Sequence, residues 1–165
     1  MVCRIGLADG GDPYVVPLSF GYEDGAVYIH SAPEASKTLS GSLKTFGSSR
    51  ISSLMTFDTS PVSSLEESSG KMIAMIRKNP RCCFEVDCCD RVIRGDTPCS
   101  WGMRYRSVIG FGRAFILEDP AEKKHGLNCI MRHYQGGTHE FSDNDIALVT
   151  VIRIPIESMT GKKHD

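Results

Sequence analysis

Residues 27–39, VYIHSAPEASKTL, join a strand-like run to side chains that can bind a ligand. The run opens with three strand formers and then reaches the imidazole of His30 and the hydroxyl of Ser31. Lys71 is a further candidate, because it stands at the start of a helix predicted over 72–78, and helix N-termini attract phosphate. We therefore expect an anion-binding site where this strand ends and this helix begins.

Four cysteines in the run CCFEVDCC resemble a metal cluster at first sight: Cys82, Cys83, Cys88 and Cys89. The run is predicted to be a strand, in which adjacent side chains point to opposite faces. A zinc knuckle instead needs a short turn that lets two sulfurs converge. We predict no metal site here, because small buried side chains are the commoner role of free cysteine.

Three histidines could act as general bases: His125, His133 and His139. No spacing in the sequence pairs one of them with a cysteine nucleophile, so a solvated or packed side chain is the favoured interpretation for each. The sequence also contains no Walker motif, dinucleotide fingerprint or Gly-Xaa-Ser-Xaa-Gly elbow. Catalytic residues are therefore left unassigned.

The composition is that of an ordinary packed domain, with 165 residues of which 41% are hydrophobic. The formal net charge of -1 gives no reason to expect nucleic acid or an anionic membrane as partner. No long apolar segment occurs, so we expect a cytoplasmic protein. The number of cysteines is seven, which is odd and favours reduced thiols over a disulfide scaffold.

The first thirty residues predict an antiparallel meander of three strands, over 3–8, 14–22 and 26–30. Turn sequences, DGGDP and EDG, separate them. Pro17 lies in the middle strand and has no amide hydrogen. We therefore expect that position at a sheet edge, at a bulge, or where a ligand approaches.

Residues 36–69 differ sharply in composition, because about half of them are serine or threonine without a regular apolar period. We predict a poorly ordered insertion, since long loops are uncommon inside compact domains. The alternative is an irregular part of the domain that covers apolar surface. After it, the helix over 72–78 spans about two turns and ends at Asn79 and Pro80.

The second half of the chain alternates strands and one clear helix. A strand over 81–89 precedes a long strand over 104–119, whose two glycines predict a bend. Asp119 is the predicted N-cap of the helix, and Pro120 stands at its first position. A strand of alternating apolar residues over 146–163 closes the chain.

Taken together, the ordered segments resemble a known family. They are CRIGLADGGDPYVVPLSFGYEDGAVYIHSAPE, KMIAMIRKNPRCCFEVD, WGMRYRSVIGFGRAFILEDPAEK and IESMTGKK. This series is similar to the pyridoxamine 5'-phosphate oxidase-like FMN-binding split barrels, most of all to the Nim-type nitroimidazole-resistance branch. The resemblance covers nearly everything outside 36–69. It implies one mainly β domain with short helices over 1–165, a six-stranded antiparallel split β-barrel that forms a homodimer with FMN between the subunits.

The resemblance also implies a set of cofactor-binding positions. They are Val16, Pro17, Leu18, His30, Ser31, Ala32, Lys71, Trp101, Arg106 and Ser107. In this set Lys71 contacts the flavin phosphate, with Lys37 as its rival because the insertion makes the alignment ambiguous. Trp101 lines the cleft with Arg104, and a role in the core is the alternative for the indole.

The function that the resemblance implies is that of an FMN-dependent oxidoreductase with a small-molecule substrate. Reduction of nitro-aromatic or nitroimidazole compounds is the reaction that the branch indicates, with the flavin supplying the redox chemistry. A non-catalytic flavin- or haem-binding module, with His30 as a cofactor contact, is the alternative. A relative in which the insertion prevents cofactor binding is a third interpretation.

Overall fold

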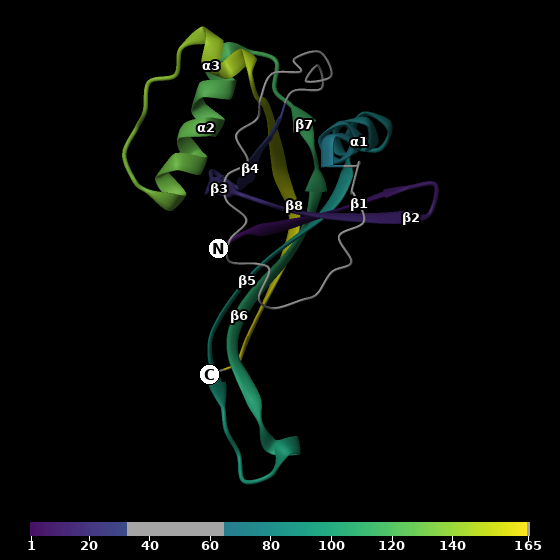
Figure 1. Ribbon diagram of the computed structural model, residues 1–165, viewed down its shortest axis with the longest axis vertical. Helices are drawn as coiled ribbons and strands as arrows, with labels where there is room; N and C mark the ends of the chain where they lie inside the picture. The colour runs from purple at the N-terminus through teal and green to yellow at the C-terminus, as the bar shows by residue number, and fades with distance from the viewer. Residues whose placement is uncertain (33–64, 165) are drawn as a thin grey trace.

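The computed structural model describes residues 1–32 and 65–164, whose strands form one curled antiparallel sheet (Figure 1). The strands are β1 (Cys3–Asp9), β2 (Asp12–Leu18), β3 (Phe20–Glu23), β4 (Ala26–Ser31), β5 (Arg81–Ile93), β6 (Gly102–Arg113), β7 (Phe115–Ile116) and β8 (Thr150–His164). The helices are α1 (Leu65–Lys78), α2 (Pro120–Tyr134) and α3 (Asp143–Ala147), with a short 3-10 helix, η2 (Pro98–Ser100). Among the described residues, no helix is long and apolar enough to cross a lipid bilayer.

The order of the strands explains how the sheet curls into a split barrel. Along the described sheet the order is β2-β1-β5-β6-β8-β4-β3, with β7 paired to β8. Strands β2 and β3 are one stretch interrupted at Ser19, and β6 and β7 are one stretch interrupted at Ala114. The predicted split-barrel fold is thus confirmed, but the strand count differs from the predicted six, because two of the stretches are each broken into two strands and the described sheet has eight. The predicted meander was wrong in its middle strand, which was expected to be one strand over 14–22. Its first half, β2, pairs with β1, and its second half, β3, pairs with β4.

The barrel interior is built by alternation along the strands and closed by α1. Every second side chain of β1, at Cys3, Ile5 and Leu7, is buried. Helix α1 covers this core with Met72, Ile73, Met75 and Ile76. The helix begins at Leu65, so the predicted start at 72 was wrong and the last residues of the predicted insertion belong to α1. Residues 36–64 of that insertion lie outside the described part of the chain.

A second core lies on the other face of β4 and β8, under α2. The helix starts as predicted, because the Asp119 carboxylate accepts hydrogen bonds from the first-turn amides at 2.9 Å. Two glycines let α2 approach the sheet closely. A Cβ at Gly21 would lie 2.5 Å from backbone atoms of Cys129, and one at Gly126 would lie 2.8 Å from Val151 Cγ1. Contact this close fixes the helix against the strands.

Strands β5 and β6 continue beyond the barrel as a long hairpin, alongside the C-terminal end of β8 (Figure 1). Strand β1 stops pairing with β5 at the Cys3–Val86 pair. We call the part beyond this pair, residues 87–107 with 162–164, the arm. Helix η2 lies at its tip, between the two hairpin strands.

Candidate functional site

The barrel opens where the β2–β3 stretch leaves β4. Strand β3 pairs with β4 from Phe20 onward, with Phe20 opposite Ile29, whereas the residues before Ser19 pair with β1 instead. Strand β4 continues past this point on its β8 side, with His30 opposite Val151. We call this place the split. Two predicted cofactor-binding segments, 16–18 and 30–32, flank it.

The side chains of these segments do not all face the same way. Ser31 faces the barrel interior. Its exposure is 7%, and among the described residues it is the polar residue that counts as buried. His30 points to the other face, toward α2, because side chains alternate along the strand. Partial burial lowers the pKa of the His30 imidazole, although the residue is exposed. A ligand in the split would therefore meet the Ser31 hydroxyl and the backbone of His30.

Strand β2 lies at the edge of the described sheet, which is one of the three situations predicted for Pro17. Pro17 is exposed, opposite Arg4 of β1. Val16 and Leu18 are partly buried and pack against the barrel core. The inward side chains of β2 therefore form an apolar wall beside the split.

Lys71 lies close to this wall. Its ammonium group is 5.1 Å from the ring centroid of Tyr14, which faces the same core as Val16 on the same strand. The expected position at a helix N-terminus was wrong, because α1 begins at Leu65 and Lys71 falls in its second turn. The helix dipole therefore does not add to its charge there, since the dipole acts within the first turn. The rival, Lys37, lies outside the described residues.

Arg106 and Ser107 are adjacent on β6 and so point to opposite faces of the sheet. Ser107 lies between Asp87 and Lys162 on the neighbouring strands. Arg106 lies between Cys88 and Lys163 on the other face. One bound molecule on a single face of the arm can meet the side chain of only one of them. Strand alternation alone could have revealed this.

Trp101 lies at the tip of the arm, directly after η2. Its side chain is 52% exposed, so the alternative of a core role was wrong. The indole Nε1 donates a hydrogen bond to the Gly95 carbonyl oxygen at 3.0 Å, and the Arg94 guanidinium lies 5.5 Å from the ring. These contacts hold a large aromatic surface at the tip of a projecting hairpin.

The outward face of β6 carries a row of side chains that we call the outer row: Met103, Tyr105, Ser107, Ile109 and Phe111. Met103, Ile109 and Phe111 are among the exposed large hydrophobic residues of the protein. Beside them the Arg4 guanidinium bridges Glu85 at 2.7 Å and Asp87 at 2.5 Å, and this hydrogen bonding lowers the pKa of Asp87. The outer face thus combines apolar side chains with a paired charge cluster.

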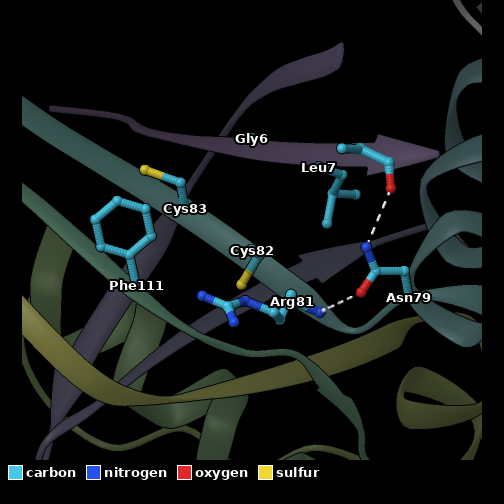
Figure 2. Close-up of a pocket in the computed structure, with 8 residues that line it drawn as sticks. Gly6, Leu7, Asn79, Arg81, Cys82, Cys83 and Phe111 are labelled. Atoms are coloured by element: carbon cyan, nitrogen blue, oxygen red, sulfur yellow. Dashed lines mark hydrogen bonds between the residues drawn. The ribbon is translucent and has the colours of Figure 1, made fainter. Parts of the chain in front are cut away.

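A cleft of about 370 Å³ opens on the same outer face, where α1 leads into β5 (Figure 2). It is lined by Gly6, Leu7, Ala8, Asn79, Arg81, Cys82, Cys83 and Phe111. The Asn79 amide nitrogen donates to the Ala8 carbonyl at 3.3 Å, and its oxygen accepts from the Arg81 amide at 3.2 Å. Sequence reasoning saw Asn79 only as a helix end. None of the predicted cofactor residues lines this cleft.

The cysteines of the described chain are free thiols. Burial raises the pKa of Cys3 to about 12 and those of Cys82 and Cys129 to about 11, so these thiols are neutral at physiological pH. Among the described residues no group of three or more histidine, cysteine or acidic side chains could hold a metal ion.

Comparison with known proteins decides which family the fold represents. A family model described as pyridoxamine 5'-phosphate oxidase matches residues 1–62 and 54–163. The chain belongs to the pyridoxamine 5'-phosphate oxidase family. No curated protein matches the sequence significantly.

Solved structures support this family and its predicted branch. A candidate 5-nitroimidazole antibiotic resistance protein from Bacteroides thetaiotaomicron is 30% identical, with a TM-score of 0.66 over 97% of this chain and 75% of that one. A flavocytochrome from Azotobacter vinelandii is 18% identical, with a TM-score of 0.67 over 99% of this chain. An FAD- and haem-binding protein from Mycobacterium smegmatis is 15% identical, with a TM-score of 0.68 over 99%. The chain spans under two thirds of these last two proteins, 62% and 65%, and the low identities show a shared fold only.

Proposed function

We propose that this family member binds a flavin, FMN, at the split and uses it to oxidise or reduce small molecules, nitroimidazoles among them. The observation that carries the proposal is the split itself, which has the apolar wall of Val16 and Leu18 on one side and Ser31 on the other. The 30% identity to a candidate 5-nitroimidazole resistance protein supports the substrate class.

The residues at the split fit a flavin in character. An isoalloxazine ring needs an apolar face and a few hydrogen-bonding groups at its edge. Val16 and Leu18 supply the first, while Ser31 and the backbone of 30–32 supply the second, because in the described chain β3 stops pairing before His30. A bound flavin would supply the electron transfer, and the chain would orient it and exclude water.

The phosphate of FMN needs a cation, for which Lys71 is the described candidate. Its ammonium group lies over Tyr14, at the end of the wall that includes Val16. A lysine binds phosphate as a point charge and needs no helix terminus to do so. Lys71 therefore stays the proposed phosphate ligand through its own charge, without a contribution from the helix dipole.

We further infer that the working unit is a homodimer. Val16, Ile5, Phe84 and Gly110 lie in one row across the sheet, and Trp101 lies nine residues from this row along β6. At roughly 3.3 Å per residue, Trp101 is about 30 Å from the split of its own chain. The arm of a second copy would bring Trp101 and Ser107 to the split, and the outer row would supply the apolar contact.

One spectrum tests the cofactor. The purified chain is incubated with FMN, passed through a desalting column, and its visible absorption is recorded. Flavin bands at one FMN per chain are the expected result, and a protein that elutes colourless would refute the proposal. An intense Soret band in untreated protein would favour the haem alternative, in which the neutral imidazole of His30 is the ligand.

A second experiment tests the substrate class. The flavin of the loaded protein is reduced chemically without oxygen and is then mixed with metronidazole, a 5-nitroimidazole. Rapid return of the oxidised flavin spectrum, with loss of the nitro-group absorbance, is expected. If the spectrum returns no faster than with the nitro-free imidazole, the nitroreductase assignment fails while flavin binding stands.

A further inference from the structure

A second cavity lies away from the split, on the face of the sheet that α2 covers. Its volume is about 450 Å³, and it opens beside the first turns of the helix. It is lined by Asp24, Tyr28, Leu117, Ala121, Glu122, His125 and Arg153. None of these residues belongs to the set assigned to the flavin. Any ligand of this cavity is therefore independent of the proposed function.

Packing fixes the floor of this cavity. Tyr28 of β4 stands directly opposite Arg153 of β8, and the phenol ring is buried. The His125 ring lies edge-on to Tyr28, with 5.5 Å between the centroids. Gly126 lets α2 approach Tyr28 and Val151 closely, so the position of His125 above the floor is set by the sheet. The cavity is a product of the core rather than of a mobile loop.

Arg153 is the cation of the cavity. Two other arginines of the sheet, Arg4 and Arg113, each contact a carboxylate. Arg153 is partly buried between Tyr28 and Phe115, and within residues 1–32 and 65–164 it has no ion pair or side-chain hydrogen bond. A partly buried guanidinium without a partner is unfavourable. A ligand carboxylate would satisfy it with two parallel hydrogen bonds.

Two carboxylates line the same cavity. Asp24 is held in the Asp-Gly turn between β3 and β4, with a φ of 48° that this turn requires. Glu122 stands in the first turn of α2. A ligand that carries only an anionic group would meet Arg153 favourably but these two carboxylates unfavourably. A ligand that carries only a cationic group would be attracted by the two carboxylates and repelled by Arg153.

We propose that this cavity binds a small zwitterion of the α-amino acid class that has an apolar side chain. Its carboxylate pairs with Arg153, and its ammonium group faces Asp24 and Glu122. Its side chain lies against the apolar part of the lining, at Leu117 and Ala121. A ligand with both charges is the class that can use Arg153 and both carboxylates, while the lining imidazole of His125 already contacts Glu23, with 3.0 Å from Nε2 to Oε2.

Calorimetric titration of the purified full chain tests the ligand class with three matched probes. They are L-phenylalanine, phenethylamine, which lacks the carboxylate, and 3-phenylpropanoate, which lacks the ammonium group. Phenylalanine is expected to bind about tenfold or more tightly than either analogue, because each analogue leaves a charged group without its partner. Absence of phenylalanine binding, or equal binding of one analogue, would overturn the proposal.

Two substitutions test the assigned roles. Arg153→Gln and Asp24→Asn should each weaken phenylalanine binding by about tenfold. Asparagine tolerates the positive φ of Asp24, so this variant preserves the turn even if Arg153→Gln disturbs the sheet. Arg113→Gln, an arginine of β6 outside the cavity, is the matched control and should bind phenylalanine as the unchanged protein does. Unchanged affinity in Asp24→Asn and Arg153→Gln would refute the site.

Discussion

The barrel and the arm use the same strands in different ways. Inside the barrel, the inward residues Ile5, Ile29, Ile152 and Ile154 are completely buried. The outward face of β4 and β8 is covered in turn by α2. Along the arm, β6 has no fully buried residue from Gly102 to Ser107. The arm nevertheless exposes large apolar side chains, at Val92, Trp101 and Met103, and the outer row continues this exposed surface to Ile109 and Phe111.

The difference teaches that the two regions obtain their stability from different sources. The barrel buries its apolar side chains within one chain, under α1 and against its own strands. The arm shows apolar side chains on a face that nothing in the described chain covers. Contiguous exposed apolar surface of this kind marks an interaction site. The barrel should therefore fold as a unit, while the arm should depend on a partner surface.

The largest effect is expected from a matched pair of isoleucines. Ile5→Ala leaves a cavity in the barrel core and should lower the free energy of unfolding by about 2–5 kcal/mol. Ile109→Ala removes a side chain that is 44% exposed, and its effect on the isolated chain should be well below this. Urea unfolding at low protein concentration measures both. Equal losses would show that the outer row is as well packed as the core.

The next effect concerns association. Phe111→Asp places a charge in the outer row and should weaken the homodimer by about tenfold or more, with loss of bound flavin. Sedimentation across a concentration series measures this change. Leu148→Asp, at an exposed position after α3, is the control and should leave the dimer intact. A Phe111→Asp protein that remains dimeric would exclude the outer row as the interface.

The Lys71→Ala variant tests whether the barrel region, through α1, binds the flavin phosphate. Loss of one charge-assisted contact to the phosphate should weaken FMN binding about tenfold, while riboflavin, which lacks the phosphate, is unaffected. Fluorescence titration with both flavins measures the difference. Equal loss for the two flavins would mean that Lys71 acts through structure. A phosphate-selective loss in Lys37→Ala instead would transfer the assignment to that residue.

Replacement of residues 36–64 by a short Gly-containing loop should have a smaller effect. The replacement spares α1, which begins at Leu65. If the segment is an insertion outside the barrel, the melting temperature should stay equal or rise slightly, because loop closure costs only about 0.6 kcal/mol per doubling of length. Differential scanning calorimetry measures the change. A large fall would show that the segment packs on the domain.

The smallest effect is a dependence on pH. Burial lowers the pKa of His30 and, with the N-terminal charge, that of His133, so the unfolded chain binds more protons than the folded one below pH 6.5. Stability should therefore fall as the pH is lowered from 7.5 through 6.5 toward the folded-state pKa values. His30→Gln should flatten this profile slightly, because its ring is still partly solvated. An unchanged profile would show that His30 does not contribute.

Several features could be predicted because their causes are local. Strands β1 and β4, the Asp-Gly turn between β3 and β4, and the start of α2 at Asp119 all follow from residues within a few positions of one another. The edge position of Pro17 follows from its missing amide hydrogen. The resemblance to the family then supplied the barrel, because the order of these local signals is specific.

Other features could not be predicted because distant segments decide them. The break at Ser19 exists because the two halves of one stretch pair with β1 and β4, which three other strands separate in the strand order. The start of α1 was missed because its first residues have the Ser-rich composition of the preceding segment. Trp101 is exposed because the arm extends past β1, which no residue near Trp101 indicates.

The amino-acid sequence by itself determined most of the strands, the helix that starts at Pro120, and which side chains of one strand share a face, since backbone geometry sets those periods within one element. Tertiary structure alone decided where the barrel opens and which groups meet there. It also brought Asp24, Glu122 and Arg153 into one cavity, from a turn, a helix and a strand that are far apart in the chain. Whether distant residues come together depends on how whole elements pack, because packing energy is the sum of many contacts and does not follow from a local sequence pattern.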